Sequence, residues 1–266
     1  PFRISFAGGG TDLKAYYAKE EGKVISTSID KYIYVVIKRQ IGIVEHKYRI
    51  NWSKVEFKSS INDIEHPIVR EALRLFGIDF PIEITTFTDI PGQTGLGSSS
   101  AFAVGLVHAL HALKGEMVSK NTIAATAANI EVDILGRSMG KQDHYASAYG
   151  NLNTFTFNKD GTVNVEPVLY RPEVRDLIEK NLNLFYLKSK RNASKILEVQ
   201  EQNTPQIFNN LTKLKGFVDP LREIFSSGLD INKFGEILHQ SWLIKKGLTD
   251  VISSTEIDTY YQKALD

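Results

Sequence analysis

The chain has 266 residues, 42% of them hydrophobic, which is enough for one large core or two modest ones. Lys and Arg number 32 against 31 Asp and Glu, so the net charge of +1 gives no global field that would recruit nucleic acid or an anionic membrane. The absence of cysteine excludes disulfides, thiolate zinc sites and a cysteine nucleophile, and it fits a protein of the reducing cytoplasm.

The first ninety or so residues predict alternating strands and helices. No stretch reaches the ~18 uninterrupted apolar residues of a membrane span, so we expect a soluble protein without a membrane partner. Runs rich in β-branched and aromatic residues predict strands, and a proline near a helical first turn predicts a helix. The predicted strands are residues 4–7, 23–38 with a break in the middle, 48–52 and 82–87, and the predicted helix is 66–73.

The rest of the chain predicts helices around one hairpin. Apolar runs predict helices over residues 101–113 and 123–135, and two short strands flanking Asn-Lys-Asp-Gly predict a hairpin near 154–165. Beyond it the composition becomes charged and helical, with one strand-like run at 182–187. We therefore predict two domains, residues 1–170 and 171–266.

A glycine-rich segment stands between the strand at 82–87 and the helix at 101–113. Glycines let backbone N–H groups turn toward one point, and the following helix adds its positive N-terminal end, so the pattern predicts a phosphate cradle. The alternative is a flexible turn with a good helix cap. The residues concerned are Pro91, Gly92, Gly95, Leu96, Gly97, Ser98, Ser99 and Ser100.

Two acidic residues follow this helix in the chain. Glu131 lies in the helix predicted over 123–135, and Asp143 follows the glycine turn at Gly140. Phosphoryl transfer needs positioning, a cation and a carboxylate that accepts the substrate proton, so Glu131 suits a metal and Asp143 a base. Taken singly, each acid is better interpreted as a solvated surface residue, and only the combination of motifs favours the catalytic interpretation.

A second glycine turn opens the chain. The strand at 4–7 leads into Gly8 and two further glycines, and the turn ends in Thr11 and Asp12. Such a turn allows a ligand to approach the backbone closely, which suits the binding of sugar hydroxyls. Capping of a helix that begins near Leu13 is the alternative, and both interpretations are compatible.

The order of these segments resembles that of the GHMP kinases. The Gly-Leu-Gly-Ser-Ser-Ser-Ala motif at 95–101, the opening segment 3–12 and the Gly-Lys-Gln-Asp run at 140–143 all match, and the resemblance covers nearly the whole chain. The segment 6–12 and the His-Gln-Ser-Trp run at 239–242 resemble the D-glycero-D-manno-heptose 7-phosphate kinases within that superfamily.

The resemblance implies an α+β fold of two domains and an active site in the cleft between them. The N-terminal domain would resemble domain 2 of ribosomal protein S5, and the C-terminal domain would be ferredoxin-like. ATP phosphates would bind the glycine loop, with Mg²⁺ on Ser99 and Glu131. Asp143 would be the catalytic base and Arg3 the basic residue near the reacting hydroxyl. The sugar-binding residues would be Gly9, Gly10, Thr11 and Asp12.

The implied reaction transfers the γ-phosphate of ATP to the anomeric hydroxyl of D-glycero-D-manno-heptose 7-phosphate, giving the 1,7-bisphosphate used in nucleotide-activated heptose synthesis. Arg191 is our first interpretation for binding the sugar's own phosphate, with Lys141 and Arg137 as further candidates and a solvated basic patch as the alternative. The partners would be these small molecules, with no nucleic acid and with a homodimer as the candidate assembly. The residues given end at Asp266, short of a third glycine-rich motif of this family.

Two other functions compete with this one. A fucokinase-like or other sugar 1-kinase would use the same segments with a different sugar pocket. A non-catalytic binding protein on the same fold would be expected to lack the metal acid or the base, whereas Glu131 and Asp143 are both present. A pyridine-dinucleotide protein is set aside because the spaced Gly-x-Gly-x-x-Gly pattern is missing.

Overall fold

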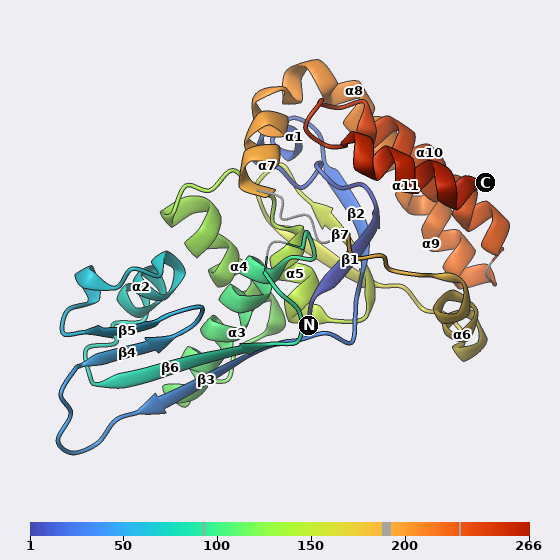
Figure 1. Cartoon of the computed structure of the whole chain (residues 1–266). Helices are drawn as coiled ribbons and strands as arrows, with labels where there is room; N and C mark the ends of the chain where they lie inside the picture. Colours follow the sequence, from blue (N-terminus) through green and yellow to red (C-terminus); the bar gives the residue numbers. More distant parts are fainter. Residues whose placement is uncertain (93, 188–192, 229) are drawn as a thin grey trace.

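The computed structural model describes residues 1–92, 94–187, 193–228 and 230–266, with 193–197 described by their backbone alone. Its strands form two four-stranded sheets, ordered β1-β2-β7-β8 and β3-β6-β4-β5 (Figure 1). The first sheet is antiparallel throughout, and in the second β4 and β6 run parallel. The strands are β1 Arg3–Ala7, β2 Gly22–Ser28, β3 Ile33–Arg39, β4 Tyr48–Asn51, β5 Val55–Lys58, β6 Ile82–Thr88, β7 Leu152–Phe157 and β8 Val163–Pro167.

Helices pack against both sheets, and α8 to α11 gather on one side of the molecule (Figure 1). The elements up to the hairpin are α1 Lys14–Tyr17, η1 Ile61–Asp63, α2 Pro67–Leu75, α3 Ser98–Leu113, α4 Lys120–Ala128, the π-helical turn η2 Asn129–Ile134 and α5 Gln142–Tyr149. The later helices are α6 Pro172–Asn181, α7 Ala193–Gln202, α8 Thr204–Gly216, α9 Val218–Ser227, α10 Ile231–Lys246 and α11 Thr255–Leu265. No helix in the described ranges is long and apolar enough to cross a membrane.

The first sheet is buried on both faces. Since successive strand residues point to opposite faces, neighbouring residues of β2 pack into different clusters. Val24 packs on one face with Tyr145 of α5. Its neighbour Ile25 belongs to a second cluster on the other face, together with Val218 of α9 and Phe234 of α10. The helices after residue 171 therefore share a core with strands of the first half, and the proposed division near residue 170 stays a prediction.

The second sheet is covered on one face by α2 and α3. The start of α2 shows how its sequence dictates the helix: Pro67 supplies the fixed φ of a first helical residue, and His66 Nδ1 accepts from Val69 N–H at 3.4 Å. Burial lowers the pKa of His66 to about 4, which keeps its imidazole neutral and able to accept that bond.

The α+β class is confirmed, and so are the strands, the hairpin and the other helices predicted before residue 170, whereas the helix predicted over 123–135 is α-helical only to Ala128 and continues as the π-helical turn η2. The strand predicted over 182–187 is wrong, because this segment forms no strand and its side chains are mostly exposed. An apolar run becomes a strand only where a sheet edge accepts its backbone hydrogen bonds. In the described residues beyond 171, all regular elements are helices, so no strand of a ferredoxin-like sheet is found there.

Candidate active site

The glycine loop joins β6 to α3 and lies against β1. Gly95 and Gly97 have φ values of +78° and +80°, a conformation that L side chains rarely adopt. Arg3 holds the loop in place: its N–H donates to Leu96 O at 3.2 Å, and its Nη1 donates to Gly95 O at 2.8 Å. Because α3 begins at Ser98, its first N–H groups lack intrahelical partners beside this loop. The arrangement suits an anion such as a phosphate.

Arg3 and Asp143 form an ion pair next to the loop. Arg3 Nε donates to Asp143 Oδ1 at 2.7 Å and Nη2 donates to Oδ2 at 2.8 Å, so the contact is bidentate. The two side chains are 15% and 17% exposed, so the pair is not sealed from solvent. A Cβ at Gly97 would lie 3.1 Å from Asp143 Oδ2, which shows how closely the loop approaches the carboxylate.

Asp12 is almost fully buried, at 2% exposure, and three donors hold its carboxylate. Oδ1 accepts from Gly10 N–H and from Gln142 Nε2, each at 3.0 Å, and Oδ2 accepts from Gln142 N–H at 3.2 Å. Burial raises the pKa of Asp12, and the negative charge of Asp143 raises it further. Ser5 Oγ donates to Gln142 Oε1 at 2.6 Å, which fixes the orientation of that amide.

The turn before Asp12 is held by Thr11. Its Oγ1 donates to Gly8 O at 2.8 Å, and Lys23 N–H donates to the same hydroxyl at 3.0 Å. Leu13 is the N-cap of α1, and no side chain caps the helix, so Thr11 and Asp12 do not have the capping role that was the alternative interpretation. Thr11 instead positions the turn, and Gly9 and Gly10 bring its backbone close to Gln142 and Gln200.

Glu131 is completely buried and lies next to the start of α3. Ser99 Oγ donates to Glu131 Oε1 at 2.5 Å, and Arg137 Nη1 donates to both of these oxygens. His144 Nε2 donates to Oε2 at 2.9 Å from a fully buried ring. Burial alone raises the pKa of Glu131, but the contacts from His144, Ser99 and Arg137 outweigh it and hold the pKa below its usual value.

These oxygens fit a Mg²⁺ ion. A carboxylate and a hydroxyl are hard ligands, and Mg²⁺ takes few protein ligands because it keeps waters and phosphate oxygens. Ser99 is the serine whose hydroxyl reaches Glu131, whereas the hydroxyl of Ser100 is buried without a hydrogen-bond partner in the described ranges. A cation already contacts the site, since Arg137 donates to both oxygens.

Other predicted binding residues lie apart from this cluster. Lys141 Nζ donates to Gly161 O at 3.0 Å and lies 5.4 Å from the ring centroid of Tyr17, so it is held at the β7–β8 hairpin. Burial lowers the pKa of Lys141. Arg191 lies outside the described residues.

Sequence reasoning missed four residues of the site. Gln142 and His144 flank Asp143 in the Gly-Lys-Gln-Asp-His run, and their residue types were a usable signal. Arg137 was considered for the sugar phosphate rather than as a partner of Glu131. Lys245 gave no signal, because α10 brings it from far along the chain. Lys245 is exposed as a residue, but the surroundings of its ammonium group lower its pKa by burial. The charge of Arg3 lowers this pKa further, while those of Asp12 and Asp143 raise it.

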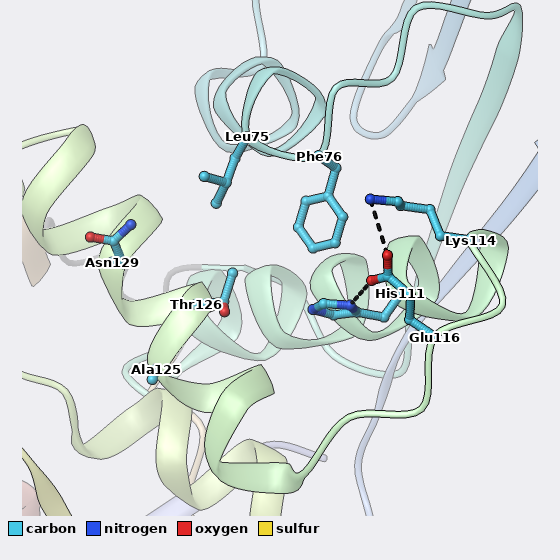
Figure 2. Close-up of a pocket in the computed structure, with 8 residues that line it drawn as sticks. All are labelled: Leu75, Phe76, His111, Lys114, Glu116, Ala125, Thr126 and Asn129. Atoms are coloured by element: carbon cyan, nitrogen blue, oxygen red, sulfur yellow. Dashed lines mark hydrogen bonds and ion pairs between the residues drawn. The ribbon is translucent and has the colours of Figure 1, made fainter.

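A separate hollow of about 470 Å³ lies between α2, α3 and α4 (Figure 2). Phe76, His111 and Thr126 are among its lining residues, and His111 Nδ1 bonds Glu116 Oε2 at 2.7 Å. It lies at the C-terminal end of α3, roughly 20 Å along the helix from Ser98 at a rise of about 1.5 Å per residue. No predicted site residue lines it.

Comparison with known proteins finds a family that part of the chain resembles. Residues 66–151, which contain the glycine loop, Glu131 and Asp143, match the family described as "GHMP kinases N terminal domain". This part of the chain is therefore similar to the N-terminal domain of the GHMP kinases. Both the predicted family and the predicted class of enzyme, a carbohydrate kinase, are thereby supported, and ATP is the phosphate donor of such kinases.

The GHMP resemblance extends over the whole chain. It is 28% identical to D-glycero-alpha-D-manno-heptose 7-phosphate kinase of Campylobacter jejuni, over 100% of this chain and 81% of that protein. It is 23% identical to the bifunctional fucokinase/GDP-fucose pyrophosphorylase of Arabidopsis thaliana, over 98% of this chain and 27% of that protein. A solved D-glycero-D-manno-heptose 1-phosphate kinase from Bacteriodes thetaiotaomicron shares the fold with a TM-score of 0.75 and 24% identity, over 92% of this chain and 78% of that one.

Proposed function

We propose that this chain is an ATP- and Mg²⁺-dependent sugar 1-kinase that phosphorylates the anomeric hydroxyl of D-glycero-D-manno-heptose 7-phosphate. The observation that carries the proposal is the bidentate Arg3–Asp143 pair lying against Gly97 of the glycine loop. It puts a carboxylate and a cation beside the phosphate cradle, which is the arrangement that phosphoryl transfer requires. The similarity to a heptose 7-phosphate kinase supports the choice of sugar.

Each residue of the cluster has a distinct task in this proposal. Asp143 accepts the proton of the attacking hydroxyl. Arg3 orients the carboxylate of Asp143 and stabilises negative charge on the transferred phosphoryl group. The loop amides and the start of α3 bind the phosphates of ATP. Glu131 and Ser99 hold Mg²⁺, which when bound neutralises charge on the phosphate oxygens.

Asp12 positions the sugar. Its carboxylate offers about four acceptor positions, and three are filled by Gly10 and Gln142. One position is left for a sugar hydroxyl, and the buried network holds the carboxylate in a fixed place. Positioning of this kind contributes to the rate because it removes the entropy cost of aligning the reacting atoms.

The test is ADP release with ATP and Mg²⁺ against D-glycero-D-manno-heptose 7-phosphate, mannose, fucose and galactose. Asp143→Asn is the loss variant, and Asp219→Asn is its matched control, since Asp219 also pairs with a basic residue but is 69% exposed on α9. We expect turnover on the heptose phosphate that falls by about 10² to 10⁴ in Asp143→Asn and persists in the control. Turnover on fucose alone would favour the fucokinase-like alternative, and turnover on no sugar would favour a non-catalytic binding protein.

A further inference from the structure

A positively charged side chain lies where the proposed divalent ion would bind. Arg137 Nη1 donates to Ser99 Oγ at 2.9 Å and also to Glu131 Oε1, while Ser99 donates to the same Oε1 at 2.5 Å. One guanidinium nitrogen thus contacts both oxygens that are proposed as metal ligands. A cation at this position neutralises the carboxylate in a way similar to a metal ion.

A backbone hydrogen bond to Glu131 holds Arg137 next to these two oxygens. The chain leaves η2 and turns at Gly136, whose φ is +62°, so that Arg137 N–H donates to Glu131 O at 3.1 Å. The Arg137 side chain is 33% exposed, whereas that of Glu131 is 0% exposed. The guanidinium therefore reaches the carboxylate from the solvent side, and it can leave by side-chain rotation without disturbing the core.

The chain needs a cation here whenever no metal is bound. Glu131 is fully buried, and a buried carboxylate is costly unless charged or hydrogen-bonding partners compensate for lost water. His144 satisfies Oε2 and Ser99 donates one bond to Oε1. Arg137 supplies positive charge at Oε1.

We propose that Arg137 is a placeholder cation, which keeps Glu131 and Ser99 in position in the metal-free protein and is displaced when a divalent ion binds. The inference rests on the proposed function, since it takes these two oxygens as the Mg²⁺ ligands. Arg137 and the ion compete for the same lone pairs, so only molecules in which the guanidinium has moved away bind the ion. The apparent metal affinity is therefore the intrinsic affinity multiplied by the fraction of molecules in which the guanidinium has moved away.

Competition predicts that removing the guanidinium tightens metal binding. We would titrate the nucleotide-free protein with Mn²⁺ and follow the free ion by electron paramagnetic resonance, comparing the wild type with Arg137→Gln. Arg222→Gln is the matched control, because Arg222 pairs with Glu166 at 2.7 Å on a different part of the surface. We expect the Mn²⁺ affinity of Arg137→Gln to exceed that of the wild type about tenfold, a change that corresponds to about 1.4 kcal/mol. The control should equal the wild type.

Thermal denaturation gives a second readout that does not depend on activity. Without metal, Arg137→Gln should melt below the wild type, and saturating Mn²⁺ should raise its midpoint by more than it raises that of the wild type. Should Arg137→Gln not fold, Arg137→Lys replaces it: a lysine keeps the charge but not the planar guanidinium, and we expect a smaller gain in affinity.

The outcomes separate this inference from the proposed function. Equal or weaker Mn²⁺ binding by the Arg137 variants, or binding by none of the proteins, overturns the placeholder role. If the wild type phosphorylates the heptose phosphate while the variants bind Mn²⁺ no better than it does, only the placeholder role fails. If the variants bind Mn²⁺ more tightly but no sugar is phosphorylated, the placeholder role stands and the proposed reaction fails.

Discussion

Gly140→Ala tests the buried position of Asp12. A Cβ at Gly140 would lie 1.8 Å from Asp12 Oδ2 and 2.3 Å from its Cγ, well inside van der Waals contact. The backbone of Gly140 is not in the left-handed region, so alanine is excluded by space and not by conformation. Either the Asp12 carboxylate moves or the turn before α5 opens, and both break the bonds between Asp12 and Gln142.

The expected size of the effect follows from that overlap. Overpacking of a filled site costs about 1–3 kcal/mol of folding stability. A displacement of about 1 Å at a positioning group costs about 100-fold in rate. We therefore expect kcat/KM for the sugar to fall about 100-fold in the coupled ADP assay, while the KM for ATP changes little because the glycine loop is untouched.

The matched control is Gly235→Ala in the interior of α10, where an added Cβ meets nothing within 4 Å. It should keep full activity and gain about 0.5–1 kcal/mol of stability, because alanine favours the helix over glycine. Wild-type sugar kinetics and wild-type thermal stability in Gly140→Ala would refute the argument that Asp12 and Gly140 are in contact.

Three further predictions concern charge and packing. Because the pKa of Glu131 is held below its ordinary 4.5, the ionised carboxylate stabilises the fold above that pH, and this contribution is lost as the pH falls. In melting scans, the midpoint of the wild type should therefore fall more steeply below about pH 4.5 than that of Glu131→Gln. Lys245→Gln should raise the KM for the sugar phosphate about tenfold, by removing a positive charge near Asp12 and Asp143; an unchanged KM for the sugar phosphate would contradict this. Phe234→Ala should lower the free energy of unfolding by about 3–5 kcal/mol in urea denaturation, since Phe234 is 1% exposed and its ring centroid lies 5.5 Å from that of Phe6. Leu265→Ala is the control: Leu265 is 53% exposed, so the free energy of unfolding should change by less than about 0.5 kcal/mol.

The sequence alone determined the local elements of the first half. β-branched and aromatic runs gave β2, β3 and β6, Pro67 marked the start of α2, and the glycine loop before α3 was evident from its residues. These features depend on backbone conformation within a few residues, which neighbouring side chains control. The glycine loop and the acids Glu131 and Asp143 were therefore identified as candidate site residues without any structure.

The tertiary structure decided which of these residues meet. Arg3 and Asp143 are 140 positions apart, and they pair because α5 packs against the sheet that contains β1. His144 was adjacent to a predicted base, yet its bond to Glu131 depends on how η2 and α5 are oriented. The strand expected at 182–187 failed for the same physical reason: a strand, like an ion pair, needs a partner from elsewhere in the chain, and local sequence does not specify whether one is within reach.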